Sequence, residues 1–233
     1  DAGLPATGPE TMSTLGGVSP PADDTYGLPK QYQFVAGDSG LHLFNLQLRL
    51  RRASLGAVAR KLKATDTITP SITGDVDLTV GPVAADRIMV TALGESHAPG
   101  KLTAPQARVD GSPPTARNAG DNTDILLRVT DRYWNMVSVS TAVTVTTLDP
   151  YDGETWNPVV FTGSTTVTVT MIQSGAQTVQ APCGSWLFTN PANPSSAITV
   201  SPQVDSRLLI LLPGETRLQG KTGAPAGKSG TPD

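Results

Sequence analysis

The alternation of apolar and polar residues along the chain predicts strands and almost no helix. The segments 124–131 and 165–171 each place an apolar residue at every second position. A period of two turns alternate side chains to one face, as in a half-buried β-strand. No stretch of a dozen residues has the three-to-four apolar spacing of a helix while being free of Gly, Pro and β-branched residues.

The same pattern places further strands, separated by turns rich in Gly, Pro, Asn and Asp. Strands at a spacing of roughly 8–12 residues are typical of a β-sandwich. A tight turn is expected at Gly37–Gly40. Strands are expected near 11–18, 32–34, 45–51, 58–64, 76–80, 88–92, 124–131, 137–145 and 165–171, and around Val179, Trp186, Phe188 and Ile198.

The chain repeats itself at a fixed spacing of 120 residues, so that residues 79–110 return at 199–230. Such a spacing indicates a tandem array, and 233 residues suit two domains of ordinary size. We expect a partial module at 1–80, a complete module at 81–200, and the opening strand and Gly/Pro-rich tail of a further module at 201–233. The matched pairs are Val80 and Val200, Pro82 and Pro202, Arg87 and Arg207, Gly94-Glu95 and Gly214-Glu215, Gly100-Lys101 and Gly220-Lys221, and Ala104-Pro105 and Ala224-Pro225.

Composition agrees with short strands and excludes several classes of partner. Gly (23) and Pro (20) are abundant, and the charged fraction of 16% is low. A net charge of −3 gives no reason to expect nucleic acid, and the longest apolar run, Leu208–Leu212, is too short to span a membrane. The residues from Pro213 onward are too poor in apolar side chains to order themselves alone.

The single cysteine, Cys183, rules out an intrachain disulfide. A reduced cytosolic protein and a bacterial surface protein stabilised by packing and repetition both fit this. Without a CxxC partner, Cys183 is expected to be a small packed or edge residue. The chain begins with Asp1 rather than Met, which suggests processing or excision from a longer protein.

Three phrases of the sequence carry a family resemblance. Y-Q-F-V-A-G-D-S-G-L-H-L-F at 32–44 leads into K-A-T-D-T-I-T-P-S-I-T-G at 63–74, and V-T-D-R-Y-W-N-M-V stands at 129–137. These phrases resemble bacterial immunoglobulin-like (Big-type) tandem repeats, which place the third phrase on a central strand. The resemblance covers most of residues 23–230. It implies tandem immunoglobulin-like β-sandwiches of a secreted or cell-surface protein, which serve as stalks, adhesive arms or filament components without enzyme activity.

One segment departs from the family pattern and is unusually basic. Residues 49–63 read R-L-R-R-A-S-L-G-A-V-A-R-K-L-K, which predicts a longer, basic hairpin. It could contact a glycan, another anion or a protein, although Lys and Arg also protect exposed strands against edge-to-edge pairing. The protective, solvated role is the default. The candidate contact residues are Arg49, Arg51, Arg52, Arg60, Lys61 and Lys63.

Residues that could carry catalysis are few. His42 is expected on a strand as a cross-strand partner, and His97 is expected to be solvated in a turn-rich connection. Trp134 is expected in or near the core. Because no nucleophile or acid/base pair is placed with a partner, we expect no catalytic residue and no cofactor.

Clustered acidic residues give a calcium alternative. Calcium takes six to eight oxygen ligands that converge on one point, and loops between modules can supply them. No cluster has the D-x-D-x-D-G spacing, and Asp is an ordinary turn residue, so solvated turns are the default. The candidate ligands are Asp121, Asp124, Asp149 and Asp152.

The repeat is incomplete at both ends. Residues 1–80 lack the counterpart of 81–130, and 201–233 open a module without continuing it. Either the chain is a segment of a longer array, or the tail of one subunit completes the first module of the next and so propagates a fibre. The candidate assembly strand is more apolar than its counterpart at 87–92, as a strand buried on both faces would be. Its residues are Arg207, Leu208, Leu209, Ile210, Leu211 and Leu212.

The sequence therefore predicts an all-β, non-catalytic structural module, located outside the cell or on its surface. The expected partners are identical subunits or neighbouring repeats, and neither nucleic acid nor membrane insertion is expected. The alternative is an adhesin that recognises a glycan or a protein through inter-module loops or the basic hairpin at 49–63.

Overall fold

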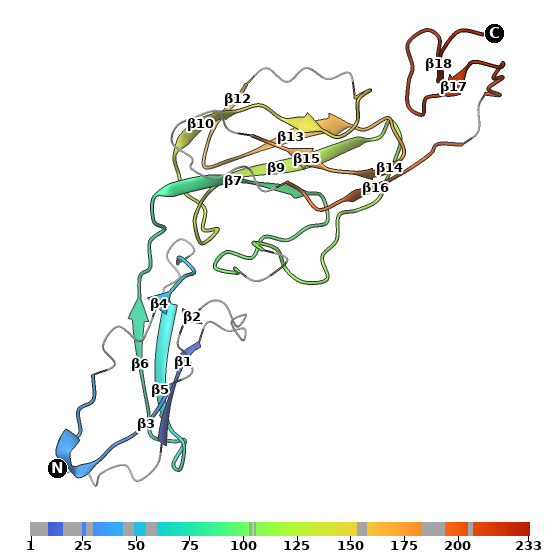
Figure 1. The fold of residues 1–233 in the computed structure, drawn as a ribbon. Helices are drawn as coiled ribbons and strands as arrows, with labels where there is room; N and C mark the ends of the chain where they lie inside the picture. Colours follow the sequence, from blue (N-terminus) through green and yellow to red (C-terminus); the bar gives the residue numbers. More distant parts are fainter. Residues whose placement is uncertain are drawn as a thin grey trace. The chain divides into compact units, whose positions relative to one another are not determined.

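The structure is a computed structural model that describes residues 9–15, 25–26, 30–43, 49–54, 60–102, 104, 106–152, 158–182, 194–204 and 207–233. Within these residues the protein is all-β, which confirms the predicted fold class, and the one helical element is the short 3₁₀ turn Ala36–Asp38 (Figure 1). No helix among them is long and apolar enough to cross a membrane.

The chain divides into two compact units. Unit 1 comprises Asp1–Val83, Ala98–Ala107 and Tyr133–Asn135, and unit 2 comprises Ala84–His97, Arg108–Arg132 and Met136–Asp233. The first boundary falls next to the module boundary expected from the repeat. Two loops of the middle module group with unit 1, and the C-terminal residues group with unit 2.

Unit 1 contains a four-stranded antiparallel sheet in the order β3-β1-β5-β6. A separate short pair joins β2 to β4. The predicted single hairpin over 49–63 is therefore wrong, because β4 and β5 belong to different sheets. The strands are β1 (Pro9–Leu15), β2 (Thr25–Tyr26), β3 (Lys30–Gln33), β4 (Arg49–Leu50), β5 (Arg60–Asp66) and β6 (Thr73–Leu78).

The turn between β5 and β6 is fixed by Asp66, the aspartate of the A-T-D-T phrase. Its Oδ1 accepts hydrogen bonds from the backbone N–H groups of Ile68 (2.7 Å) and Thr69 (2.8 Å). Its own N–H donates to the Ile72 carbonyl at 3.0 Å. An aspartate that binds its following backbone in this way favours a turn over strand continuation.

Unit 2 is built around the three-stranded antiparallel sheet β13-β9-β7. Shorter pairings join β10 to β12, β11 to β15 and β17 to β18, and β16 lies between β14 and a parallel β8. The strands are β7 (Ala85–Ala92), β8 (Arg117–Asn118), β9 (Asn122–Asp131), β10 (Ser140–Val143), β11 (Thr146–Thr147), β12 (Val159–Thr162), β13 (Ser164–Thr170), β14 (Gly175–Gln177), β15 (Val179–Gln180), β16 (Ile198–Ser201), β17 (Thr216–Arg217) and β18 (Lys228–Ser229).

The core of unit 2 follows the predicted alternation. Ile125, Leu127 and Val129 of β9 are fully buried, as are Val90 of β7 and Val169 of β13. Side chains from β10, β12, β15 and β16 close the same core, as two packed layers of strands require. Each fully buried aliphatic side chain contributes about 1.5–3 kcal/mol, so this core supplies much of the stability of the unit.

Candidate functional site

The loop that follows β7 and the C-terminal segment share one backbone turn. The N–H of Glu95 donates to the Ala92 carbonyl at 3.0 Å, and the N–H of Glu215 donates to the Leu212 carbonyl at 3.0 Å. Glu95 Oε2 in turn accepts the Ala92 N–H at 2.7 Å, and Glu215 Oε2 accepts the Leu212 N–H at 2.8 Å. We call residues 92–115 the first loop and residues 212–233 the C-terminal loop.

Each turn is made possible by a glycine with positive φ. Gly94 has φ +97° and Gly214 has φ +83°, a region that L-residues rarely adopt. At Gly94 an added Cβ would lie 2.7 Å from the Thr115 nitrogen and 2.8 Å from the Pro113 oxygen. The identity of Gly94 and Gly214 in the repeat therefore reflects a backbone requirement.

The middle of each loop also keeps its hydrogen bonds. In unit 1, the N–H of Ala98 donates to the Ala107 carbonyl at 2.7 Å and the N–H of Ala107 donates to the Lys101 carbonyl at 3.1 Å. The equivalent bonds of the C-terminal loop, from Leu218 to Gly227 and from Gly227 to Lys221, are both 2.8 Å. The 120-residue repeat is thus a repeat of structure as well as of sequence.

An ion pair has the same place in both loops. Arg108 Nε lies 2.6 Å from Glu95 Oε1, and Lys228 Nζ lies 2.7 Å from Glu215 Oε1. Sequence reasoning missed the basic partners because Arg and Lys are not identical residues. A comparison of charge at the 120-residue spacing would have found them.

The two ion pairs differ in what surrounds them. In unit 2 the Arg108 guanidinium also donates to the Pro194 carbonyl at 2.6 Å, and Glu95 Oε1 accepts the Ser196 N–H at 3.2 Å. The Arg108 and Glu95 side chains are accordingly 7% and 0% exposed, whereas those of Lys228 and Glu215 are 25% and 6% exposed. The first loop is covered by the end of its own module, and the C-terminal loop is less covered.

The candidate assembly strand, Arg207–Leu212, pairs with no strand in the described part of the chain. Leu208 is 98% exposed and Ile210 is 74% exposed, although their counterparts in β7, Ile88 and Val90, are 1% and 0% exposed. An open groove of about 690 Å³ lies between this segment and the C-terminal loop.

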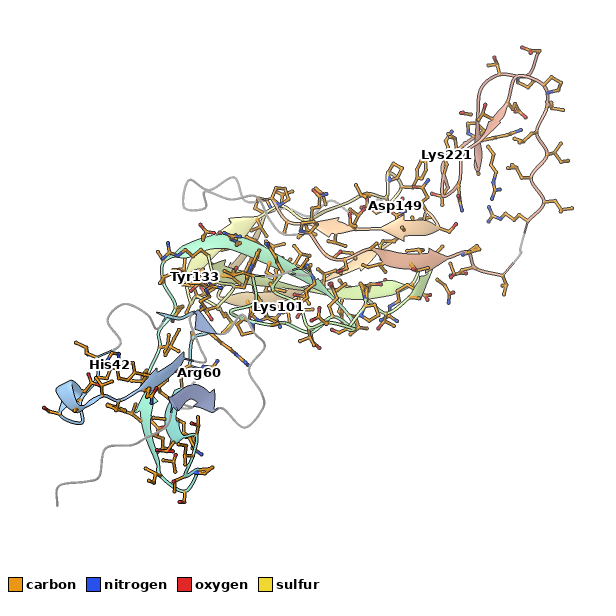
Figure 2. All side chains as sticks on the ribbon, turned by 60° about the horizontal axis from the view of Figure 1, so that its bottom comes forward. His42, Arg60, Lys101, Tyr133, Asp149 and Lys221 are labelled. Atoms are coloured by element: carbon orange, nitrogen blue, oxygen red, sulfur yellow. The ribbon has the colours of Figure 1, made fainter. Side chains whose placement is uncertain are left out.

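The candidate basic residues lie in or beside β4 and β5. The Arg60 guanidinium, labelled in Figure 2, donates to the Ala53 carbonyl at 2.9 Å. The β5–β6 backbone register sets Lys61 opposite Asp77 and Lys63 opposite Asp75. Arg49 lies in β4, and Arg51 and Arg52 follow it, both half-buried. The contact with Ala53 gives the Arg60 side chain a structural role.

The four candidate calcium ligands take part in separate hydrogen bonds. Asp149, labelled in Figure 2, is 3% exposed, and its carboxylate accepts the N–H groups of Tyr151 (2.9 Å) and Gln173 (2.7 Å). Asp152 accepts the Thr147 hydroxyl.

The other two aspartates belong to the β8–β9 region. Asp121 accepts the Asn118 N–H at 3.2 Å, and Asp124 accepts the Thr168 hydroxyl at 2.9 Å. Within the described ranges, no group of three or more His, Cys, Asp or Glu residues could hold a metal ion.

The surroundings of His42 and His97 differ from those expected from the sequence. His42, labelled in Figure 2, lies outside the described strands, because Ser39 and Gly40 turn the chain with φ of 49° and 79°. Its ring stacks on Tyr32, with ring centroids 3.4 Å apart. His97 is half-buried rather than solvated. Cys183, Trp186 and Phe188 fall outside the described residues.

Tyr32 also connects the stack to Asp38. Its hydroxyl donates to Asp38 Oδ2 at 2.8 Å, and the Val35 N–H donates to the same oxygen at 2.8 Å. The Val35 N–H and the Tyr32 hydroxyl together lower the pKa of Asp38. These contacts hold the expected turn at 37–40 in place.

The phrase V-T-D-R-Y-W-N-M-V is placed differently from the family expectation. β9 ends at Asp131, and Trp134 and Asn135 follow it beyond a turn at 132–133. Trp134 has φ +66° and is 2% exposed, in agreement with its expected burial. The Asn135 amide binds a distant backbone segment, since Oδ1 accepts the Ala53 N–H at 2.7 Å and Nδ2 donates to the Arg51 carbonyl at 2.8 Å. Nothing local in the sequence signals this contact.

No family model matches the chain, and no curated protein matches it. A solved structure of surface layer protein SbsC, domains 1–6, is similar with a TM-score of 0.28 and 14% sequence identity. The match covers 95% of this chain and 24% of that chain, so this chain spans about a quarter of its length.

Proposed function

We propose that the chain is a non-catalytic structural module of an extracellular bacterial repeat protein or filament. The observation that supports this is the C-terminal loop, which reproduces the turn, the middle hydrogen bonds and the ion pair of the first loop. A supersecondary unit repeated at a constant spacing is how repeat proteins build extended arrays from similar modules. The extracellular location rests on the resemblance of 32–44 and 63–74 to Big-type repeats.

Neighbouring modules join head to tail by strand complementation in this proposal. Arg207–Leu212 is the segment that requires a partner, because it is apolar and exposed where the equivalent β7 is paired and buried. A contact between two different surfaces of like molecules repeats without closing on itself and produces a fibre. The adhesin alternative receives no such support, since the Arg60 guanidinium of the basic segment donates to the Ala53 carbonyl.

The proposal is tested on cells and on purified protein. An antibody raised against the chain should label intact cells of the source organism, whereas labelling only after permeabilisation would contradict an extracellular role. For the purified chain, light scattering after size exclusion should show a mass that rises with concentration, and negative-stain images should show filaments. A monomer at every concentration would contradict head-to-tail assembly.

A further inference from the structure

We infer that Tyr151, Gln173 and Ser174 form a docking site for the loop that opens the following module, which in this chain is the C-terminal loop. Residues 51–54 form the equivalent site in unit 1, where Asn135 occupies it. The inference rests on the proposed structural role, since a protein built of similar modules needs the same contact at each of them.

The C-terminal loop meets the docking site at Gly220. A Cβ added to Gly220 would lie 3.0 Å from Tyr151 Cδ2 and 3.0 Å from Gln173 Cα. Beside this contact, the Gln219 side-chain amide donates to the Ser174 hydroxyl. The turn at 219–220 is therefore the part of the loop that the site recognises, and all of these residues belong to unit 2.

The site fits a loop that has a glycine at the point of contact. Gly220 has φ +84°, which L-residues rarely adopt, and the 3.0 Å available to a Cβ is shorter than an ordinary carbon–carbon contact of about 3.5–4.0 Å. A side chain there would push the loop away from the Tyr151 ring. Gly100, the repeat counterpart of Gly220, is buried and has φ +90°. The repeated glycine thus identifies the docking turn in both loops.

Two buried side chains hold the docking site in shape. Asp149 is 3% exposed, and its carboxylate accepts the Tyr151 N–H at 2.9 Å and the Gln173 N–H at 2.7 Å, so it joins the two segments of the site. Gln177 is 4% exposed and donates from Nε2 to the Gln173 carbonyl at 3.1 Å. Figure 2 labels Asp149 of the site and Lys221 of the loop. A surface that is already ordered loses less conformational entropy when its partner docks.

The same position of the repeat is contacted in unit 1. A spacing of 120 residues sets Ala53 at the place of Gln173. The Ala53 N–H donates to Asn135 Oδ1 at 2.7 Å, and the nearby Tyr133 carbonyl accepts the Gly100 N–H at 2.7 Å. Two contacts made by different atoms therefore fall on one repeat position, as expected of a docking site that each module carries.

Limited trypsin digestion of the whole chain tests the site in unit 2. Cleavage after Lys221 requires the C-terminal loop to leave its site, and its rate follows the population of the open loop. Tyr151→Ala removes the ring that Gly220 contacts and should accelerate this cleavage about tenfold. Tyr151→Phe keeps the ring and should be cleaved at the rate of the unaltered chain. Mass spectrometry of the product that ends at Lys221 gives the rates.

Cleavage after Arg128, within β9, reports unfolding of unit 2 and should not change in these variants. Gln219→Ala changes an exposed side chain of the loop, and loss of its hydrogen bond to Ser174 should accelerate cleavage after Lys221 about threefold. This variant decides the matter if Tyr151→Ala also accelerates cleavage after Arg128. Unchanged cleavage after Lys221 in Gln219→Ala, or a Tyr151→Phe variant cleaved as fast as Tyr151→Ala, would overturn the inference.

Asn135→Leu tests the equivalent site in unit 1. It should accelerate cleavage after Lys101, which is 5% exposed, and leave cleavage after Lys221 and after Lys63 of β5 unchanged. Tyr151→Ala should not alter cleavage after Lys101. A parallel rise after Lys63, or no rise after Lys101, would overturn the site in unit 1.

The docking sites and the structural role fail in different experiments. Unchanged digestion of the variants, with antibody labelling of intact cells as expected, would remove the docking sites and leave the structural role. Labelling only after permeabilisation would contradict that role whatever the digestion shows.

Discussion

Arg108 and Glu95 form an ion pair in which Nε and Oε1 are 2.6 Å apart and both side chains are almost inaccessible to solvent. The pair connects four parts of unit 2. Arg108 reaches the carbonyls of Val90 and Pro194, and Glu95 accepts the N–H groups of Ala92 and Ser196. It therefore ties β7 to the segment that precedes β16.

Replacement of Arg108 by methionine is expected to destabilise unit 2 by about 3–5 kcal/mol, because it leaves the buried Glu95 carboxylate without its partner. Urea unfolding followed by tryptophan fluorescence measures the change. The matched control is Lys228→Met, which removes the equivalent cation where it is 25% exposed. Its effect should be about 1 kcal/mol or less. Equal losses of unfolding free energy in Arg108→Met and Lys228→Met would contradict the expectation that the more buried ion pair contributes more to stability.

Gly94→Ala is expected to cost about 1–3 kcal/mol, since Gly94 has φ +97° and its new Cβ would meet backbone atoms of residues 113–115. Thermal unfolding of the whole chain measures the loss. Gly81→Ala is the control, because nothing lies within 4 Å of its Cβ position and its φ is not in the left-handed region. A Gly94→Ala variant as stable as Gly81→Ala would contradict the proposed backbone requirement.

Acidification is expected to open the C-terminal loop. The hydrogen bond from Lys228 and then that from the Leu212 N–H lower the pKa of Glu215 below its ordinary value of 4.5. A carboxylate with a lowered folded-state pKa stabilises the folded loop above the unfolded value, and this contribution is lost as the pH falls through the folded pKa. An NMR titration should show the Leu212 amide signal shifting below pH 4.5. Glu215→Gln should abolish that shift, and a shift that persists would assign it to another group.

Asn135→Leu is expected to destabilise unit 1 by about 1–3 kcal/mol, since it leaves the Ala53 N–H and the Arg51 carbonyl without their side-chain partner. Hydrogen exchange at the Ala53 amide should accelerate in the variant. Asn122→Ala serves as the control, because its exposed side chain accepts one hydrogen bond from Thr170. Unchanged exchange at Ala53 in Asn135→Leu would contradict this assignment.

The strands of unit 2 could be predicted because their signal is local. Ile125, Leu127 and Val129 alternate within one segment, and all three are fully buried in β9. The strand expected at 165–171 is likewise found as β13, Ser164–Thr170. A half-buried strand alternates apolar and polar residues within its own sequence. It can therefore be predicted without knowing which strands lie beside it.

The features that could not be predicted depend on contacts between distant segments. Asn135 binds the backbone at Ala53, 82 residues earlier, and the sequence around neither residue predicts this contact. The basic residues of β5 suggested a charged patch until the register set Lys61 and Lys63 opposite Asp77 and Asp75. A register is a property of two strands together, and one sequence segment does not contain it.

The direction of the strands in unit 2 bears on how such a module responds to mechanical tension. Figure 1 shows β7 beginning at one end of the group of strands that form the core of unit 2, and β16 ending at the opposite end of that group. A pull applied through the flanking residues would act along the strands, so that the hydrogen bonds between β7 and β9 would be sheared together rather than broken one after another. A module connected in this way suits a stalk that is stretched along its length.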